Sequence, residues 1–555
     1  MLLSNLNLLA TAPGGVVRLR ELILTLAVQG KLVPQDPSDE PASDLLKKIR
    51  AEKERLIAEG KIKRDKPLAE IAEDEKPFEL PESWQFCRLG SLVLSIRSGG
   101  TPSKHIPAYW DGDIPWASVK DLRFGEPLTN TQDRITQAGL EAGSVLAPTG
   151  SILICTRMGL GKIGEALIDV AINQDLKAVM LGLGVDKQYF INYFKTLAVV
   201  GSGMTVAGIK QDELLGFLVP LPPEAEQSRI VTRVEELMRL CDELEAKGKL
   251  EATQHEQLTR TLLGALTQCD TPEQLQESWQ RMAEHFDLLL DRPEAVDALE
   301  QTILQLAVRG LLVPQDPNDE PANELLKKIR AEKDRLIAEG KIKRDKPLPP
   351  IAKALYPCAL PAGWEWMRFS EIGEFRGGKT PSTQQAIYWG GEIPWITPKD
   401  MKQPLLSDSV DKVTLLAVAD GLALIPSQSV LIVVRSGILR RTLPTAINIV
   451  ETTINQDLKA LVLVRPTLAG FVQLLIRGFE GFILENLTKV GTTVESMQFE
   501  AFSMQAFPLP PLAEQSRIVT RVNELRRLCA DLRKRLAERQ ATQAQLAEAL
   551  VLQTA

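Results

Sequence analysis

Apolar residues recur at alternating steps of four and three along two stretches of the chain. The first stretch contains Ile230, Val234, Leu237, Cys241 and Leu244, and the second contains Ile518, Val522, Leu525, Cys529 and Leu532. This spacing predicts long helices with an apolar seam, each about 40 residues or about 60 Å in length. Because two matched seams occur in one chain, we expect the two helices to pack on each other. The alternative is that each helix packs on its own domain.

The chain also contains two copies of a shorter helical pattern. Residues 19–71 return at 299–351, with about three quarters of the positions identical. Each copy predicts two helices, at 16–30 and 43–60 in the first copy and at 297–310 and 323–340 in the second. A second repeat opens each long helix, at Pro222 and Pro510. The halves of the chain therefore have the same order of parts, which suits a pseudo-twofold molecule.

Between the helical repeats the pattern changes to short apolar runs with Gly and Pro between them, which is typical of strands. We therefore predict an α+β fold with two mainly-β domains that contain short helices. Long paired antiparallel coiled-coil helices would join these domains in a pseudo-twofold arrangement. In chain order, the expected parts are a helical scaffold segment (1–80), a first β domain (81–221), a long helix (222–268), a linker with the scaffold repeat (269–360), a second β domain (361–509) and a C-terminal long helix (510–555).

Composition narrows the classes of function. The 555 residues carry a net charge of −7, so any site for a polyanion must be local. The six cysteines are scattered and only three histidines occur, which predicts neither a metal site nor a disulfide framework. The sequence has no apolar run near the roughly 18 residues of a membrane span. We expect a cytoplasmic protein with no membrane partner.

Two glycine-rich segments resemble nucleotide loops without their surroundings. Residues 373–380 read GEFRGGKT, but Pro381 follows where a phosphate-binding loop needs a helix. Gly159, Gly161 and Gly164 have dinucleotide-loop spacing, again with no helical pattern after them. We predict no catalytic residues and no cofactor in this chain.

Three motifs occur twice in the same order. Gly99 to Trp116 and Gly378 to Trp395 contain GGTPS or GKTPS followed by YWxG and IPW. INQD starts at Ile172 and Ile454, and AEQSRIV starts at Ala225 and Ala513. With this double set, nearly the whole chain resembles the specificity (S) subunits of type I DNA restriction-modification systems.

The resemblance implies a non-catalytic subunit with two target-recognition domains. Each domain would read one half of a split, asymmetric double-stranded DNA site, and the helices would set the spacer. The implied partners are two methyltransferase subunits, which bind S-adenosylmethionine, and two restriction subunits, which use ATP and Mg.

We expect charged or amide side chains on predicted loops to contact DNA. The alternative for each candidate is a loop charge that faces only solvent. The candidates in the first domain are Arg97, Lys104, His105, Lys120, Arg157, Lys162 and Lys210. Those in the second domain are Arg376, Lys379, Gln384, Lys399, Arg435, Arg440, Arg441 and Lys489. Two other functions stay open at this point. One is a coiled-coil adaptor whose β-rich domains bind proteins or sugars, and the other is an NTP-dependent enzyme that uses the GGKT loop.

Overall fold

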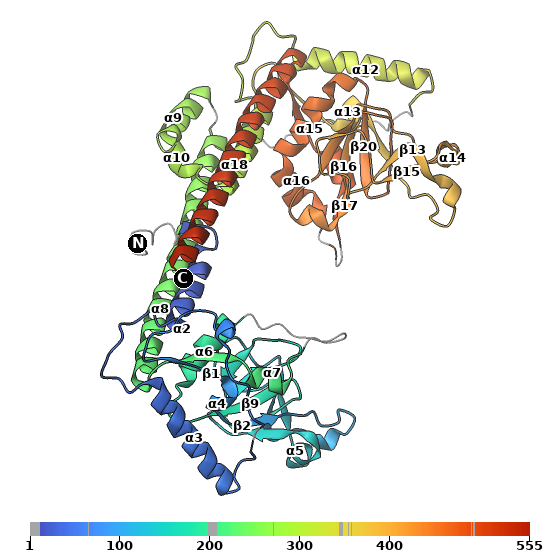
Figure 1. The fold of residues 1–555 in the computed structure, drawn as a ribbon. Helices are drawn as coiled ribbons and strands as arrows, with labels where there is room; N and C mark the ends of the chain where they lie inside the picture. Colours follow the sequence, from blue (N-terminus) through green and yellow to red (C-terminus); the bar gives the residue numbers. More distant parts are fainter. Residues whose placement is uncertain are drawn as a thin grey trace. The chain divides into compact units, whose positions relative to one another are not determined.

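The structure is a computed structural model that describes residues 11–64, 66–197, 208–269, 271–342, 348–352, 355–356, 358–489, 491 and 494–554. The chain forms two compact units, one of Met1–Glu251 with Gln540–Ala555 and the other of Ala252–Arg539. Both combine helices with small sheets (Figure 1). This confirms the predicted α+β class and the repeated architecture.

The helical scaffold of unit 1 consists of α2, α3 and parts of two long helices. Their bounds are α2 (Gly15–Val28), α3 (Ala42–Ala58), α8 (Glu224–Thr267) and α18 (Leu512–Thr554). Helix α8 has 44 residues and α18 has 43, close to the predicted length. Unit 2 contains the remaining parts of α8 and α18 together with α9 (Pro272–Ala283), α10 (Phe286–Leu289), α11 (Pro293–Val308) and α12 (Ala322–Ala338).

The two predicted seams belong to different hydrophobic clusters. In unit 1, Ile230 and Val234 of α8 are buried in a cluster with Leu19 and Ile23 of α2, with Leu237 and Leu244 partly buried against it. In unit 2, Ile518 and Val522 of α18 are buried in a cluster that includes Leu299 and Ile303 of α11, again with Leu525 and Leu532 against it. Each seam therefore packs within its own unit.

The long helices also share these clusters with each other. In unit 1, Ala547 near the end of α18 is buried with the seam of α8. In unit 2, Leu263 and Leu266 near the end of α8 share a cluster with Leu536 of α18. The start of one helix thus shares a cluster with the end of the other, as in antiparallel packing, so both arrangements left open by the sequence occur.

The β domain of unit 1 begins and ends in one strand pair. Strand β1 (Gln85–Arg88) pairs antiparallel with β10 (Leu218–Leu221). One four-stranded sheet has the order β2 (Val93–Ser98), β9 (Leu176–Leu181), β6 (Ile152–Cys155) and β7 (Ile163–Glu165). The other has the order β4 (Asp133–Ile135), β3 (Trp110–Ala117), β8 (Val170–Ile172) and β5 (Val145–Ala147). The short helices are η2 (Glu73–Glu75), α4 (Leu89–Leu92), η3 (Pro107–Tyr109), α5 (Gln137–Gly143), α6 (Lys187–Thr196) and α7 (Gln211–Leu215).

The β domain of unit 2 has the same plan with one more small sheet. Strand β11 (Glu365–Met367) pairs with β23 (Phe507–Leu509). A five-stranded sheet follows the order β12 (Gly373–Gly377), β20 (Leu458–Leu463), β16 (Val430–Val433), β18 (Thr445–Asn448) and β14 (Leu405–Leu406). Two three-stranded sheets have the orders β15 (Asp411–Val413), β13 (Trp389–Ile396), β19 (Thr453–Ile454) and β17 (Arg435–Ser436), β22 (Glu495–Met497), β21 (Thr488–Lys489). The short helices are α13 (Phe369–Ile372), η5 (Ala386–Tyr388), α14 (Leu415–Ala419), η6 (Gly437–Arg440), η7 (Pro466–Leu468), α15 (Ala469–Gly478), α16 (Glu480–Asn486) and α17 (Phe499–Met504).

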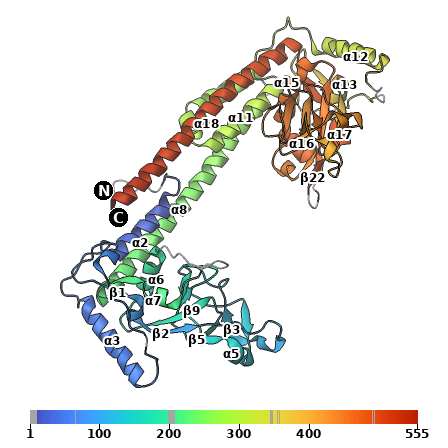
Figure 2. The same cartoon turned by 45° about the vertical axis from the view of Figure 1, so that its right-hand side comes forward.

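Each β domain rests on its own scaffold through an apolar helix. Helix α6 contacts α2 in unit 1, and α15 contacts α11 in unit 2 (Figure 2). Phe190 and Phe194 of α6 and Phe471 of α15 are almost fully buried. Burial of such aromatic side chains contributes a large share of the apolar area that stabilises a domain.

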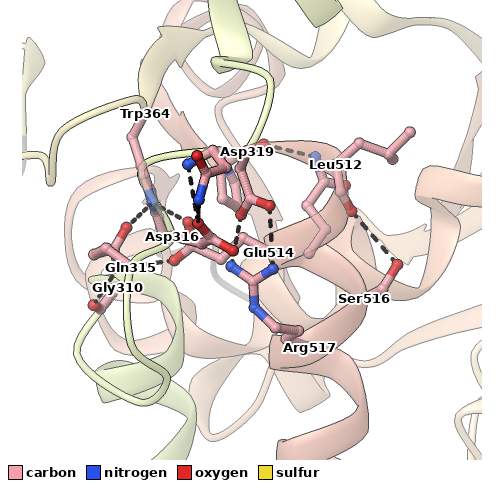
Figure 3. Close-up of polar contacts among 12 residues, drawn as sticks. Gly310, Gln315, Asp316, Asp319, Trp364, Leu512, Glu514, Ser516 and Arg517 are labelled. Carbon is pink, nitrogen blue, oxygen red and sulfur yellow. Dashed lines mark hydrogen bonds and ion pairs between the residues drawn. The ribbon is translucent and has the colours of Figure 1, made fainter.

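A buried polar cluster marks the start of each long helix. In unit 2 the carboxylate of Glu514, 1% exposed, accepts hydrogen bonds from Trp364 Nε1 (3.0 Å) and Gln315 Nε2 (2.8 Å), as Figure 3 shows. Arg517, three residues later, forms an ion pair of 2.6 Å with Asp319. We call this arrangement the Trp–Glu–Gln cluster. It joins the scaffold loop, the entry of the β domain and the long helix.

Unit 1 repeats the Trp–Glu–Gln cluster with equivalent residues. Glu226 accepts hydrogen bonds from Trp84 Nε1 at 3.0 Å and from Gln35 Nε2 at 2.7 Å. Arg229 pairs with Asp39 at 2.5 Å. Burial raises the pKa of both glutamates, against the effect of the hydrogen bonds from tryptophan and glutamine. The AEQSR motif is therefore repeated because it anchors the helix start.

Candidate nucleic-acid interface

The repeated motifs of the first β domain meet in one place. The backbone amide of Gly100, in the GGTPS motif, donates to the carbonyl of Ile172 beside INQD at 2.9 Å. The indole of Trp116, from IPW, donates to the carbonyl of Gly100 at 3.3 Å. The Thr101 hydroxyl donates to the side-chain oxygen of Gln174. We call this meeting of three motifs the motif junction.

Glycine is required where the motifs touch. A Cβ on Gly99 would lie 2.1 Å from the carbonyl oxygen of Asn173, and one on Gly378 would lie 2.1 Å from that of Asn455. Real Cβ atoms essentially never approach a backbone oxygen so closely, so only glycine lets the two backbones pack. The same requirement in both domains explains why this glycine is repeated.

The second β domain contains an equivalent motif junction. The amide of Lys379 donates to the carbonyl of Ile454 at 3.0 Å, and the indole of Trp395 donates to the carbonyl of Lys379 at 3.2 Å. Thr380 Oγ1 donates to Gln456 Oε1 at 2.5 Å. Two domains that have diverged elsewhere thus keep the same polar contacts here.

Aromatic side chains hold the junction from inside each domain. Trp110 and Trp116 meet edge to face with centroids 5.1 Å apart, and Trp389 and Trp395 do so at 5.0 Å. Trp116 and Trp395 are buried. These two indoles are therefore core residues that fix the loop, and their rings are not available for stacking on bases.

An arginine lies at the solvent edge of each junction. Asn173 and Asp175 of INQD bond to each other, and Arg157 Nε lies 3.9 Å from the Asp175 carboxylate. In the second domain Arg435 lies 4.0 Å from Asp457. The side chains of Arg157 and Arg435 are 50% and 61% exposed. Each guanidinium is oriented from one side by a carboxylate and keeps donors free for a phosphate or a base edge.

The other candidates of the first domain differ in their surroundings. Lys104, His105 and Lys120 are exposed in turns, and Lys210 is exposed just before α7. Lys162 is half-buried and donates to the carbonyl of Val119 at 3.0 Å. Arg97 was expected on a loop but lies on β2, where its guanidinium donates to the carbonyl of Leu146 at 3.1 Å.

In the second domain, the candidates Lys379, Gln384, Lys399 and Arg441 are exposed in loops or turns, as expected. Four others were expected on loops and lie on regular elements instead: Arg376 on β12, Arg435 on β17, Arg440 in η6 and Lys489 on β21. The loop expectation was wrong for them because these elements span only two to five residues, too few for a visible alternation or helical period. Arg376 lies 3.0 Å from Glu374, and Arg440 lies 3.2 Å from Glu495.

Both glycine-rich segments have other roles. Residues 373–377 form β12, and the GKT residues continue into the motif junction. Gly159 and Gly161 lie between β6 and β7, which pair as an antiparallel hairpin, and Gly164 lies on β7. Neither segment has the strand, loop and helix of a nucleotide site.

Among the described residues, no group of three or more His, Cys, Asp or Glu side chains could hold a metal ion. Within the same residues, no single helix is long and apolar enough to cross a membrane. One bent helix pair, Pro466–Gly478 with Glu480–Asn486, meets the length and composition criteria jointly.

The family model described as the type I restriction modification DNA specificity domain matches this chain twice, at residues 81–254 and 361–539. The chain belongs to this family. Each match runs from a β domain into the long helix that follows it.

Members of the type I specificity family from Escherichia coli align over almost the full chain. The specificity subunit of type I restriction enzyme EcoEI is 33% identical, with 97% of this chain and 93% of the relative covered. The EcoAI specificity subunit is 34% identical with the same coverage. The solved HsdS subunit from Thermoanaerobacter tengcongensis has 18% identity and a TM-score of 0.39 over 86% of this chain and 98% of its own.

Membership in the type I specificity family gives the chain the function of a specificity subunit, which is a non-catalytic component. It does not favour the coiled-coil adaptor that the sequence left open. The sequence analysis proposed Arg157 and Arg435 as DNA contacts but missed their neighbours Thr101, Gln174 and Asp175.

A signal for these three residues was present in the sequence. The same residue types recur at the equivalent positions of the second half, as Thr380, Gln456 and Asp457.

Proposed function

We propose that residues 81–221 and 361–509 are two target-recognition domains, each of which reads one half of a bipartite, asymmetric DNA site. The main support is the motif junction, which is built twice with the same contacts inside domains that otherwise differ. The same docking geometry would present different side chains to different bases. The long helices would set the spacer between the half-sites and dock the partner subunits.

Comparison of the two domains separates the candidate residues by role. Arg97, Lys120 and Arg157 have arginine or lysine counterparts at Arg376, Lys399 and Arg435. A side chain that is the same in both domains cannot distinguish two different half-sites. We assign these pairs to the DNA backbone, which is chemically the same at both halves.

The candidates that differ between the domains are assigned to the bases. Lys104 and His105 are replaced by Thr383 and Gln384 at the equivalent exposed turn. Gly100 is replaced by Lys379. A glutamine can bond to adenine with two hydrogen bonds, and a good contact of this kind supplies about 1–3 kcal/mol of discrimination.

The proposed assembly contains two methyltransferase and two restriction subunits in the cytoplasm. S-adenosylmethionine, ATP and Mg would be bound by those partners. Each β domain contains about a dozen basic residues and as many acidic ones, far from the charge of an autonomous DNA-binding domain. We therefore expect the chain alone to bind DNA weakly at physiological salt and the methyltransferase complex to bind tightly, as measured by titration of labelled duplex.

The test is methylation-sensitive long-read sequencing of DNA from cells that express this chain with its neighbouring methyltransferase subunit. A split motif with methyl-adenine in both halves, lost when the chain is omitted, is expected. An active, assembled methyltransferase that gives no such motif would refute the proposal.

Variants of the same complex test the two roles. His105→Ala should relax base preference in one half-site and leave the other unchanged. Lys120→Ala should weaken binding to all sequences and reduce the salt slope by about one. Arg55→Ala, on the exposed face of α3, is the matched control. A changed motif in the Lys120→Ala variant, or an unchanged one in His105→Ala, would reverse the assignment of that residue.

A further inference from the structure

The interfaces between the first scaffold helix and the long helix have nearly the same apolar surface in both units. Leu19, Ile23 and Ala27 of α2 correspond to Leu299, Ile303 and Ala307 of α11. On the long helices, the seam of α8 is repeated residue for residue in α18. Apolar packing alone therefore cannot make α2 prefer α8 over α18.

The charges that border this interface in unit 1 place a cation on the short helix. Arg20 of α2 lies 2.6 Å from Asp242 and 3.2 Å from Glu245, both on α8. It also lies 3.9 Å from the sulfur of Met238, one turn earlier on α8. The long helix is the acidic partner here.

The equivalent charges in unit 2 have the opposite signs. Position 20 corresponds to Glu300 of α11, and position 245 corresponds to Arg533 of α18. Glu300 lies 2.5 Å from Arg533 and 3.0 Å from Arg526, which replaces Met238. Ala530 replaces Asp242, and Arg533 also pairs with Asp297 at 2.6 Å. The long helix is the basic partner in this unit.

We propose that this exchange of signs makes each scaffold helix accept only the apolar seam near the start of the long helix of its own half. If α2 packed on the seam of α18, Arg20 would face Arg526 and Arg533. If α11 packed on α8, Glu300 would face Asp242 and Glu245. Both wrong pairings place like charges at a position where the correct pairing has an ion pair.

The ion pairs themselves add little stability. The carboxylates of unit 1 are exposed, and such pairs contribute about 0–1 kcal/mol. The pairs of unit 2 are more buried, and the cost of desolvating their charges offsets most of the attraction. Their effect lies in the difference between correct and wrong partners, because like charges at an interface disfavour it while the apolar contacts stay the same. The wrong partner that matters most is a second copy of this chain. If α2 of one copy took the place of α11 in a second copy, and the reverse, the two copies would form a mispaired dimer, which we call the swapped dimer.

The test gives unit 1 the residues of unit 2 in the full-length chain, as Arg20→Glu, Met238→Arg, Asp242→Ala and Glu245→Arg together. This variant keeps an ion pair in unit 1 and loses only the difference in sign between the units. The wild type and the variant are unfolded in urea and refolded by dilution. The dimeric fraction is then measured by size-exclusion chromatography with light scattering. Mixed ¹⁴N and ¹⁵N chains and cross-linking mass spectrometry identify dimers in which α2 of one copy contacts the seam of α18, residues 518–533, in another.

We expect a monomeric wild type and roughly a tenfold larger swapped-dimer fraction in the variant, because the repulsion at both wrong pairings is removed. The control, Arg233→Glu with Glu236→Arg, inverts a 3.0 Å pair within α8 and should match the wild type. A reciprocal variant gives unit 2 the residues of unit 1, as Glu300→Arg, Arg526→Met, Ala530→Asp, Arg533→Glu and Asp297→Val. It also carries Arg477→Gln, because Arg477 lies 3.9 Å from Glu300. It should also form swapped dimers, whereas the chain that carries both sets of changes should be monomeric again.

Recovery in the combined chain would exclude simple structural damage as the cause of dimer formation. If both single-unit variants unfold at the wild-type temperature and remain as monomeric as the wild type, the proposal is wrong. Dimers that persist in the combined chain would also overturn it, since the sign difference is present there in inverted form.

Discussion

Removal of the buried glutamate should affect the two Trp–Glu–Gln clusters unequally. In unit 1, the indole N–H of Trp84 donates to Glu226, and no second acceptor for it is present among the described residues. In unit 2, the indole of Trp364 donates both to Glu514 at 3.0 Å and to Gln315 Oε1 at 3.2 Å. We therefore expect Glu226→Ala to destabilise its unit more than Glu514→Ala.

The magnitude follows from the groups left without a partner. Trp84 is 6% exposed, so its unpaired indole N–H costs about 1–3 kcal/mol. Gln35 is exposed and also donates to the carbonyl of Gly30, so its loss is smaller, about 0.5 kcal/mol. The Glu226→Ala variant should lose about 2–3 kcal/mol and the Glu514→Ala variant about 1 kcal/mol less, because Gln315 retains the bond from Trp364.

Native-state hydrogen exchange measures both effects locally in the same chain. A loss of about 2.8 kcal/mol corresponds to roughly 100-fold faster exchange. We expect such acceleration in peptides around Trp84 and the first turns of α8 in Glu226→Ala, and a several-fold smaller one around Trp364 and the start of α18 in Glu514→Ala. Equal acceleration, or a larger effect in Glu514→Ala, would refute the reasoning that the second acceptor matters.

Two further predictions concern pH and backbone contact. The pKa of Glu226 is raised, mainly by burial, so its ionisation is opposed in the folded state. The stability of the wild type relative to Glu226→Gln should therefore fall as pH rises above the ordinary glutamate pKa of about 4.3. Thermal unfolding at several pH values measures this difference, and a difference that grows with pH would contradict the assignment. Gly99→Ala should destabilise the first β domain by more than about 2 kcal/mol, because its Cβ would meet backbone oxygen. Gly264→Ala, in α8 with open space around it, should stabilise the chain by about 0.5–1 kcal/mol. Calorimetry compares the two glycine variants, and equal effects would show that the junction does not require glycine.

The sequence by itself determined the regular parts of this protein. The long helices and the two scaffold copies follow from periodicity, and strands such as β6 and β16 follow from short apolar runs, because each signal extends over several residues. The internal repeat also determined that the chain has two comparable halves. Local pattern was sufficient there because these elements depend on contacts between near neighbours in the chain.

Only the tertiary structure decided how the separate motifs combine. Gly99, Trp116 and Asn173 are far apart in sequence, and their contact explains motifs that composition and spacing left unexplained. It also decided that the seam of α8 packs on α2, and it brought Arg20 next to Glu245. Nothing in a local pattern specifies which of two identical apolar surfaces will be the partner. That choice depends on charges that become neighbours only after the chain has folded.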